Sequence, residues 1–295
     1  MEVRIDANAN ANIRYKAITL QFMAAVLWSF GGPLIKLVDL HPVAIAGIRS
    51  FIAVFVISFF LKGSAFKLTK IKIFGAISYA AMVLLYVAAT KATTAANAIL
   101  LQYSAPIYIA IFGSWLLKEK ARLRDWITIL FVIAGMVLFF MDDISGGGVL
   151  GNILAILSGV AMAFNTMLMR KQKDADPLEN VFWGSILTIV FSIPFVFQQA
   201  PSTKSWIGLL LLGVFQLGFS FVLYSKAIKN ITALESTFIS LVEPLLNPVF
   251  VFLMVGEFPG GMAVLGGIVV LTAVTISCIK PKREPLTENS DKNSI

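Results

Sequence analysis

The chain has 295 residues, of which 58% are hydrophobic and only 14% are charged, and its mean hydropathy is +0.85. Because a soluble domain carries about 25% charged residues, this composition excludes a soluble globular fold and predicts a membrane protein. The formal net charge of +8 would suit nucleic-acid binding, so the positions of the basic residues have to decide that question.

Ten segments of the chain are long and apolar enough to cross a bilayer, which takes about 20 residues as a helix. They are, in chain order, residues 17–38, 43–61, 71–90, 95–117, 125–141, 150–169, 179–198, 206–225, 232–255 and 262–279. The head, 1–16, and the tail, 280–295, are polar and are predicted to be disordered. The sequence therefore predicts an all-α polytopic membrane protein with ten transmembrane helices.

The basic residues gather in the segments that would face one side of the lipid bilayer. With the N-terminus in the cytoplasm, 20 of the 24 Lys and Arg residues lie in inner segments and three lie in outer ones. This is the positive-inside asymmetry of polytopic proteins, and it places both termini in the cytoplasm. The positive charge thus indicates topology and not a nucleic-acid partner.

The second half of the chain repeats the first. Residues 74–119 of the first half return about 138 positions later in the second half. Each half contains five predicted spans. A duplicated unit with an odd number of crossings inserts its second copy upside down, and inverted repeats are typical of secondary transporters. We therefore predict two inverted five-helix repeats, 17–141 and 150–279. The matched residues are Gly75/Gly213, Tyr86/Tyr224, Ala89/Ala227, Lys91/Lys229, Ala95/Ala233, Pro106/Pro244 and Glu119/Glu257.

Sequence motifs for catalysis are missing. His41 is the only histidine and Cys278 the only cysteine, so no Cys/His zinc site and no disulfide within the chain are expected. No phosphate-binding loop is present, which excludes ATP-driven transport by this chain alone. We expect a protein that is not an enzyme and has no cofactor or metal; an intramembrane hydrolase or transferase is the remaining enzymatic alternative.

Two charged side chains fall at membrane depth. Arg49 lies about 10 Å below the outer surface, at about 1.5 Å per helical residue, and Glu243 lies near the midplane. Since an ionised group at the bilayer centre costs at least about 2.5–3.5 kcal/mol, such residues are candidates for function. The structural alternative for both is a charge pair that fixes helix packing.

Proline and glycine predict bends near the midplane. A proline inside a helix leaves the carbonyl four residues earlier without its intrahelical partner, and Pro106 and Pro244 lie at equivalent positions of the two copies. The freed carbonyls would be those of Gln102 and Ser240. Small residues in the first span predict a third bend, although they are also common packing points. The predicted kink or hinge residues are Gly31, Gly32, Pro33, Pro106 and Pro244.

Polar and amphipathic side chains lie in the same middle band of both halves. Some of them are expected to serve helix packing, and Tyr86, Tyr224 and Trp183 are assigned to the interfacial aromatic belt. Lys36 is expected in an outer vestibule. The residues predicted to line a central substrate cavity are Trp28, Arg49, Tyr79, Asn97, Gln102, Glu243 and Asn247.

These residues also carry a family resemblance. Trp28-Ser29, followed by Lys36, Pro42 and Arg49, looks like a Trp-Gly…Lys…Pro…Arg-Phe stretch, and segments 95–119 and 233–257 resemble a duplicated Pro-to-Glu signature. Over residues 17–279 the chain is similar to EamA-type members of the drug/metabolite transporter superfamily. It departs from the pattern at Ser29, which replaces a glycine, and at Ala105, the first-copy counterpart of Glu243.

The resemblance implies ten helices in two inverted halves around a cavity lined by helices one to four and six to nine. Many members of the family export amino acids or related compounds, and others move nucleotide sugars, cofactors or drugs. We therefore expect a monomeric or homodimeric transporter of the inner or plasma membrane that exports an amino acid or related compound by alternating access. A coupling proton or a counter-substrate would drive it.

In this hypothesis Arg49 and Lys36 attract the anionic part of a zwitterionic solute, while Glu243 contacts an ammonium group or carries the coupling proton. Two alternatives stay open. A lipid or drug flippase of the same fold would need a side portal between helices. A non-transporting membrane sensor or assembly subunit would be expected to carry a substantial soluble segment.

Overall fold

The computed structural model describes residues 2–61, 69–93, 95–139, 141, 148–246 and 261–278, and it contains no strand within these ranges. The helices of the first half are α1 (Glu2–Trp28), α2 (Gly31–Leu37), α3 (Pro42–Ser58), α4 (Lys70–Ala92), α5 (Ala95–Gln102), α6 (Ala105–Leu117) and α7 (Leu123–Phe139). Those of the second half are α8 (Val149–Lys171), α9 (Leu178–Val196), α10 (Thr203–Leu211), the π-helix η1 (Leu212–Phe219), α11 (Ser220–Ala227), α12 (Ala233–Ser240) and α14 (Gly261–Cys278). Residues 242–246 are also helical.

Several of these helices can cross a membrane. Among the described residues, six helical segments are long and apolar enough, and they are Asn12–Leu37, Lys70–Ala92, Asn97–Leu117, Val149–Lys171, Leu178–Val196 and Thr203–Ala227. Two shorter apolar helices, Pro42–Ser58 and Val264–Ser277, accompany them. The chain is therefore an all-helical, multi-pass membrane protein, and the number of ten spans stays a prediction.

The N-terminal head differs from its prediction. We expected residues 1–16 to be disordered, but α1 begins at Glu2. The segment contains neither Gly nor Pro, and extending an existing helix needs no new nucleus. Arg14 also forms an ion pair with Glu235 at 2.7 Å, which fastens this part of α1 to α12. The tail, 280–295, lies outside the described residues.

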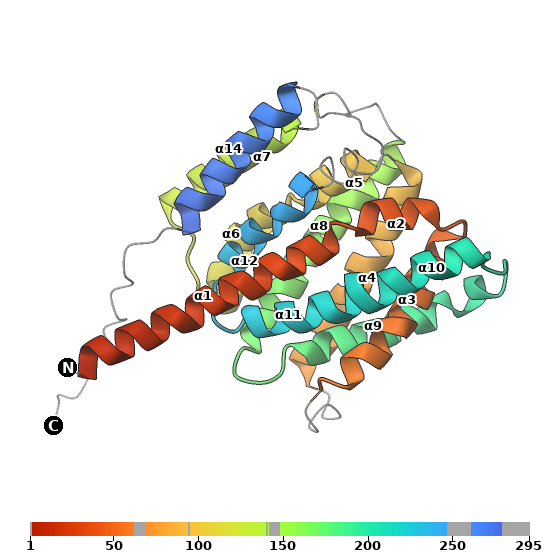
Figure 1. Ribbon diagram of the computed structural model, residues 1–295, viewed down its shortest axis with the longest axis horizontal. Coiled ribbons are helices and arrows are strands. Elements are labelled where there is room, and N and C mark those ends of the chain that lie inside the picture. The colour runs from red at the N-terminus through yellow and green to blue at the C-terminus, as the bar shows by residue number, and fades with distance from the viewer. Residues whose placement is uncertain are drawn as a thin grey trace.

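The helices α7 and α14 form a pair at the edge of the molecule, set apart from the other helices (Figure 1). Their backbones meet at two glycines, since a Cβ added at Gly266 would lie 2.5 Å from the carbonyl oxygen of Gly135. Neither helix contributes a residue to the central cavity. The pair therefore serves as scaffold, and the apolar composition of both helices agrees with that role.

The remaining helices pack across the two halves in reciprocal pairs. The α4 helix of the first half packs on α9, and η1 of the second half packs on α3. The repeated glycines lie in these two contacts: Gly75 faces Asn180, and Gly213 faces Ile52, so closely that a Cβ at either position would fall within 3.0 Å of that side chain. Reciprocal contacts of this kind are what a two-fold relation between two halves produces.

The repeated lysines also have matching contacts. Lys91 donates from Nζ to the carbonyl oxygen of Val38 at 2.8 Å, and Lys229 donates to that of Ala175 at 2.6 Å. Each lysine thereby ties the end of the third predicted span of its half to the connection between the first two. The duplication is thus visible in individual hydrogen bonds as well as in helix packing.

Candidate functional site

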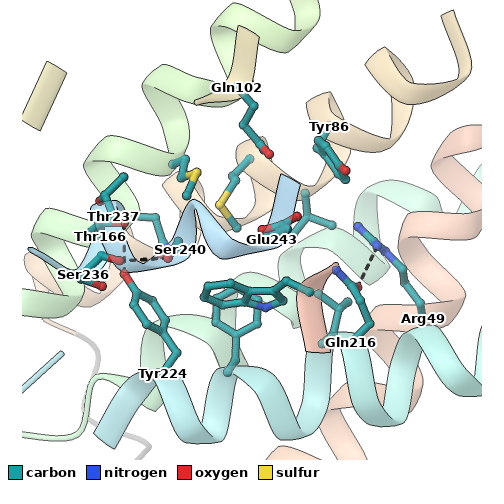
Figure 2. Close-up of a pocket in the computed structure, with 17 residues that line it drawn as sticks. Arg49, Tyr86, Gln102, Thr166, Gln216, Tyr224, Ser236, Thr237, Ser240 and Glu243 are labelled. Atoms are coloured by element: carbon teal, nitrogen blue, oxygen red, sulfur yellow. Dashed lines mark hydrogen bonds between the residues drawn. The ribbon is translucent and has the colours of Figure 1, made fainter. Parts of the chain in front are cut away.

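A cavity lies between the two halves (Figure 2). Its wall is built from α1, α3, α4 and α5 of the first half and from α8, η1, α11, α12 and residues 242–246 of the second. The lining residues are Trp28, Arg49, Met82, Val83, Tyr86, Gln102, Met162, Asn165, Thr166, Gln216, Leu217, Phe221, Tyr224, Ser236, Thr237, Ser240 and Glu243.

Two helix interruptions at the cavity follow from the repeated prolines. Pro106 comes just after the break between α5 and α6, and Pro244 comes just after the break between α12 and residues 242–246. Because proline has no N–H, the carbonyls of Gln102 and Ser240 lose their intrahelical partners. Tyr103 donates its hydroxyl to the Ser240 carbonyl at 2.7 Å. A side chain of the first half therefore satisfies the carbonyl that the kink of the second half exposes.

Two further irregular segments adjoin the cavity. The break between α1 and α2 covers residues 29–30, directly before the predicted hinge residues Gly31, Gly32 and Pro33. The π-helix η1 is the other, and π-helical turns occur frequently at functional sites. The role of either segment as a moving hinge stays a prediction.

An aromatic wall covers one side of the cavity. The ring of Trp28 lies 5.2 Å from those of Phe221 and Tyr224, measured between centroids. Tyr86 and Tyr224 are both buried, so their assignment to the aromatic belt is wrong. The two repeated tyrosines instead enter the cavity from opposite halves, because equivalent helices turn equivalent faces toward the centre.

One cation and one anion face this cavity. Arg49 is 1% exposed and donates from Nη1 to Oε1 of Gln216 at 3.1 Å. Glu243 is 8% exposed, and its Oε2 lies 2.9 Å from the hydroxyl oxygen of Tyr103, whose single proton it shares with the Ser240 carbonyl. Their side chains reach toward the same part of the cavity (Figure 2). The ion pairs within the described residues include neither of them. Both charges therefore remain available to a ligand.

Of the residues predicted to line the cavity, Trp28, Arg49, Gln102 and Glu243 do so. Gln102 is held in place by donating to Ser158 Oγ at 2.7 Å. Their predicted role in substrate binding is a separate matter and stays a prediction. Asn247 lies outside the described residues.

Tyr79 and Asn97 do not belong to the cavity wall, contrary to the prediction. Tyr79 lies two helical turns from Tyr86, which does line the cavity. Tyr79 is fully buried and packs edge-on against Phe221. Asn97 donates to Thr93 Oγ1 at 3.3 Å, away from the cavity. Lys36 is exposed and donates from Nζ to the Thr93 carbonyl at 3.2 Å. These side chains are engaged in contacts, two of them with other helices, that residue type alone does not reveal.

Sequence reasoning missed part of the wall. Met82, Met162 and Phe221 resemble the lipid-facing residues around them, so no signal in the sequence distinguishes them. Ser236 and Ser240 could have been found, because they are four residues apart and so share one helix face. They contact Gln21, which donates to Ser240 Oγ at 2.8 Å and accepts from Ser236 Oγ at 3.2 Å.

In the described part of the chain, three ion pairs connect the two halves at one end of the molecule. We call it the basic end because the basic loops around Lys118–Arg124 and Arg170–Lys173 lie there. Each pair joins one residue of the first half to one of the second. The pairs are Arg14–Glu235, Lys72–Glu179 and Glu119–Arg170.

Glu119 and Arg170 form the most extensively bonded of these contacts. Arg170 Nε lies 2.9 Å from Glu119 Oε1, and its Nη1 donates to the carbonyls of Ile228 and Lys229. The second carboxylate oxygen of Glu119 accepts from the backbone N–H of Ala233 at 3.2 Å, at the start of α12. Glu119 thereby contacts the end of α8 and the start of α12, and Arg170 connects both to the end of α11.

The opposite end is joined by neutral groups within the described part of the chain. Thr93 donates to Asn152 Oδ1 at 3.1 Å, and the backbone N–H of Asp39 donates to Ser205 Oγ at 3.3 Å. Hydrogen bonds between neutral groups are weaker than charge-assisted ones. The two ends of the molecule therefore differ in how firmly they join the halves.

Comparison with known proteins agrees with this architecture. A family model described as the EamA-like transporter family matches residues 15–141 and 149–279. An uncharacterized transporter of Archaeoglobus fulgidus is 28% identical over 194 residues, which cover 65% of this chain and 70% of that protein. Mouse solute carrier family 35 member G1 is 29% identical over 173 residues, covering 52% of this chain and 46% of that protein.

A solved crystal structure has the same fold. It aligns with a TM-score of 0.77 at 18% sequence identity, and the alignment covers 90% of this chain and 97% of the other. At this identity the likeness concerns the fold alone.

Proposed function

Because this chain belongs to the EamA-like transporter family, we propose that it is a secondary transporter that exports a small amphipathic metabolite, an amino acid or related compound, across the cell membrane. The observation that carries the proposal is the cavity between the halves, which combines an aromatic wall with one buried cation and one buried anion. Such a cavity suits a zwitterion with an apolar side chain.

The proposed contacts follow from the charges. A buried charge without a partner is costly, and an opposite charge with good hydrogen bonds offsets that cost. Arg49 would bind the carboxylate of the solute, and Glu243 would bind its ammonium group or carry a coupling proton. The apolar part of the solute would lie against Trp28 and Phe221, whose large rings provide most of the contact area.

Alternating access is the proposed mechanism. Rocking of one repeat against the other around a central site needs no ATP. With both termini in the cytoplasm, the basic end is the cytoplasmic one, and its inter-half ion pairs keep the cavity closed on that side. Loading a solute from the cytoplasm would require these pairs to open while the neutral contacts at the opposite end stay formed, and release would require those contacts to open in turn.

The experiment that tests the proposal joins ligand binding to flux. The purified protein is screened by thermal shift against amino acids, amines, nucleosides and sugars, since a bound ligand stabilises by mass action, and each hit is followed in proteoliposomes. We expect Glu243→Gln to abolish the flux or to remove its pH dependence, with unchanged expression and monodispersity. Asp174→Asn, which removes an exposed carboxylate from the α8–α9 connection, is the control. Unchanged transport and pH dependence in Glu243→Gln would reject the assigned role.

The flippase alternative finds little support. A long-chain substrate would need an opening from the bilayer into the cavity. An apolar groove does exist between α3, α9 and α10, lined by residues such as Phe51, Ile193 and Trp206, but it shares no lining residue with the cavity. The relatives are named an uncharacterized transporter and a member of solute carrier family 35, which favours transport over a purely sensory or assembly role.

A further inference from the structure

Arg49 is a buried cation that no described carboxylate neutralises. Its one hydrogen-bonded partner within the described residues is the side-chain oxygen of Gln216, and its Nε atom is buried without a hydrogen-bond acceptor. An arginine presents five N–H donors in a fork that matches a carboxylate. The guanidinium at the cavity wall is therefore only partly satisfied, and no carboxylate of the described residues balances its charge.

Gln216 reaches Arg49 because two glycines make room for it. A Cβ at Gly213, three residues earlier on η1, would lie 2.9 Å from the carbonyl oxygen of Arg49, so this glycine lets η1 approach α3. A Cβ at Gly31, at the start of α2, would lie 2.9 Å from the Nε2 atom of Gln216. The break between α1 and α2 thus leaves the space in which the amide lies.

The π-helical turn supports the same placement. Gln216 lies within η1, and its backbone carbonyl accepts a hydrogen bond from the hydroxyl of Ser220. The side chain is 6% exposed and belongs to the cavity wall. Figure 2 shows the hydrogen bond between the side chains of Arg49 and Gln216, which come from opposite halves of the chain.

The neutrality of this partner is what matters chemically. A glutamate at the same position would form a charge-assisted pair with Arg49 and occupy the donors that face the cavity. A glutamine orients the guanidinium and leaves its positive charge uncompensated. We infer that Gln216 is a positioning residue that presents Arg49 to the anionic group of the solute and so sets a preference for carboxylate-bearing over neutral or purely cationic solutes. This inference rests on the proposed transport function.

The first arm of the test needs no ligand. The full-length protein is purified with Gln216→Glu or Gln216→Met, and its thermal unfolding is measured. Gln216→Glu supplies the missing negative charge and should raise Tm by about 2–4 °C, whereas Gln216→Met removes the acceptor and should lower Tm. Gln199→Glu, which makes the same change at an exposed position of the α9–α10 connection, should leave Tm unchanged. A Tm that does not rise in Gln216→Glu overturns the inference, because Arg49 is then not short of an anion.

The second arm measures binding of L-phenylalanine and L-phenylalaninamide, which differ in the carboxylate. The wild type should bind the acid at least about tenfold more tightly than the amide. Gln216→Glu should lose that preference through weaker binding of the acid alone. A merely structural residue would change the affinity for both probes alike, and that result would also overturn the inference. If the wild type binds neither probe, the solute class proposed above is wrong, while the Tm comparison still decides the role of Gln216.

Discussion

The ion pair between Glu119 and Arg170 gives the sharpest prediction about the proposed transport cycle. In Glu119→Gln the side chain keeps its length and one acceptor oxygen but loses its charge. A hydrogen bond to a charged group contributes about 1.5–3 kcal/mol, and Glu119 is about a quarter exposed, with 27% side-chain exposure, so the lower part of this range applies. Arg170 retains its bonds to two backbone carbonyls, and the fold should persist.

Glu119→Gln should therefore destabilise the state that is closed at the basic end by about 1.5–2 kcal/mol. Since every 1.4 kcal/mol is about a tenfold change in an equilibrium, the ratio of closed to open molecules should fall about 10–30-fold. This shift is large enough to detect as a change in the accessibility of the cavity from the basic end, which the proposed topology places in the cytoplasm.

Cysteine labelling measures that accessibility. In a Cys278→Ser background, a single cysteine at Met162, in the cavity wall on α8, is labelled with a membrane-impermeant maleimide in inverted membrane vesicles. Glu119→Gln should increase the labelling rate about tenfold, and the control Asp174→Asn, with the same change in charge at the same end, should leave it unchanged. Equal labelling rates in the parent protein, Glu119→Gln and Asp174→Asn, with the fold intact, would show that the Glu119–Arg170 pair does not control access to the cavity.

Two predictions concern stability. Gly213→Val should lower the unfolding temperature in detergent, because the new side chain meets Ile52 and overpacking of this kind costs about 1–3 kcal/mol. The control is Gly261→Ala, where an added Cβ has nothing within 4 Å. Equal effects of the two substitutions would contradict the close contact between the halves. Tyr103→Phe should destabilise by about 1–3 kcal/mol, since it leaves the Ser240 carbonyl unsatisfied. An unchanged denaturation midpoint would show that another group satisfies that carbonyl.

The duplicated positions can be recognised from the amino-acid sequence alone, but their meaning depends on packing. Gly75 and Gly213 repeat because each leaves room for the second predicted span of the other half. Tyr86 and Tyr224 repeat because both face the cavity, which the aromatic-belt interpretation did not predict. A repeat reveals that a position matters, while its neighbours decide why.

Membrane insertion, the internal duplication and the proline kinks follow from properties that a sequence carries locally: hydropathy summed over a span, register between two copies, and a missing backbone N–H. The contacts of the cavity and of the basic end join residues far apart in the chain, such as Arg49 with Gln216, Tyr103 with Ser240, and Glu119 with Arg170. They depend on how each helix is rotated about its own axis. A helix that is apolar on every side carries little pattern to indicate that rotation, so only the packing of all the helices together decides which side chains meet.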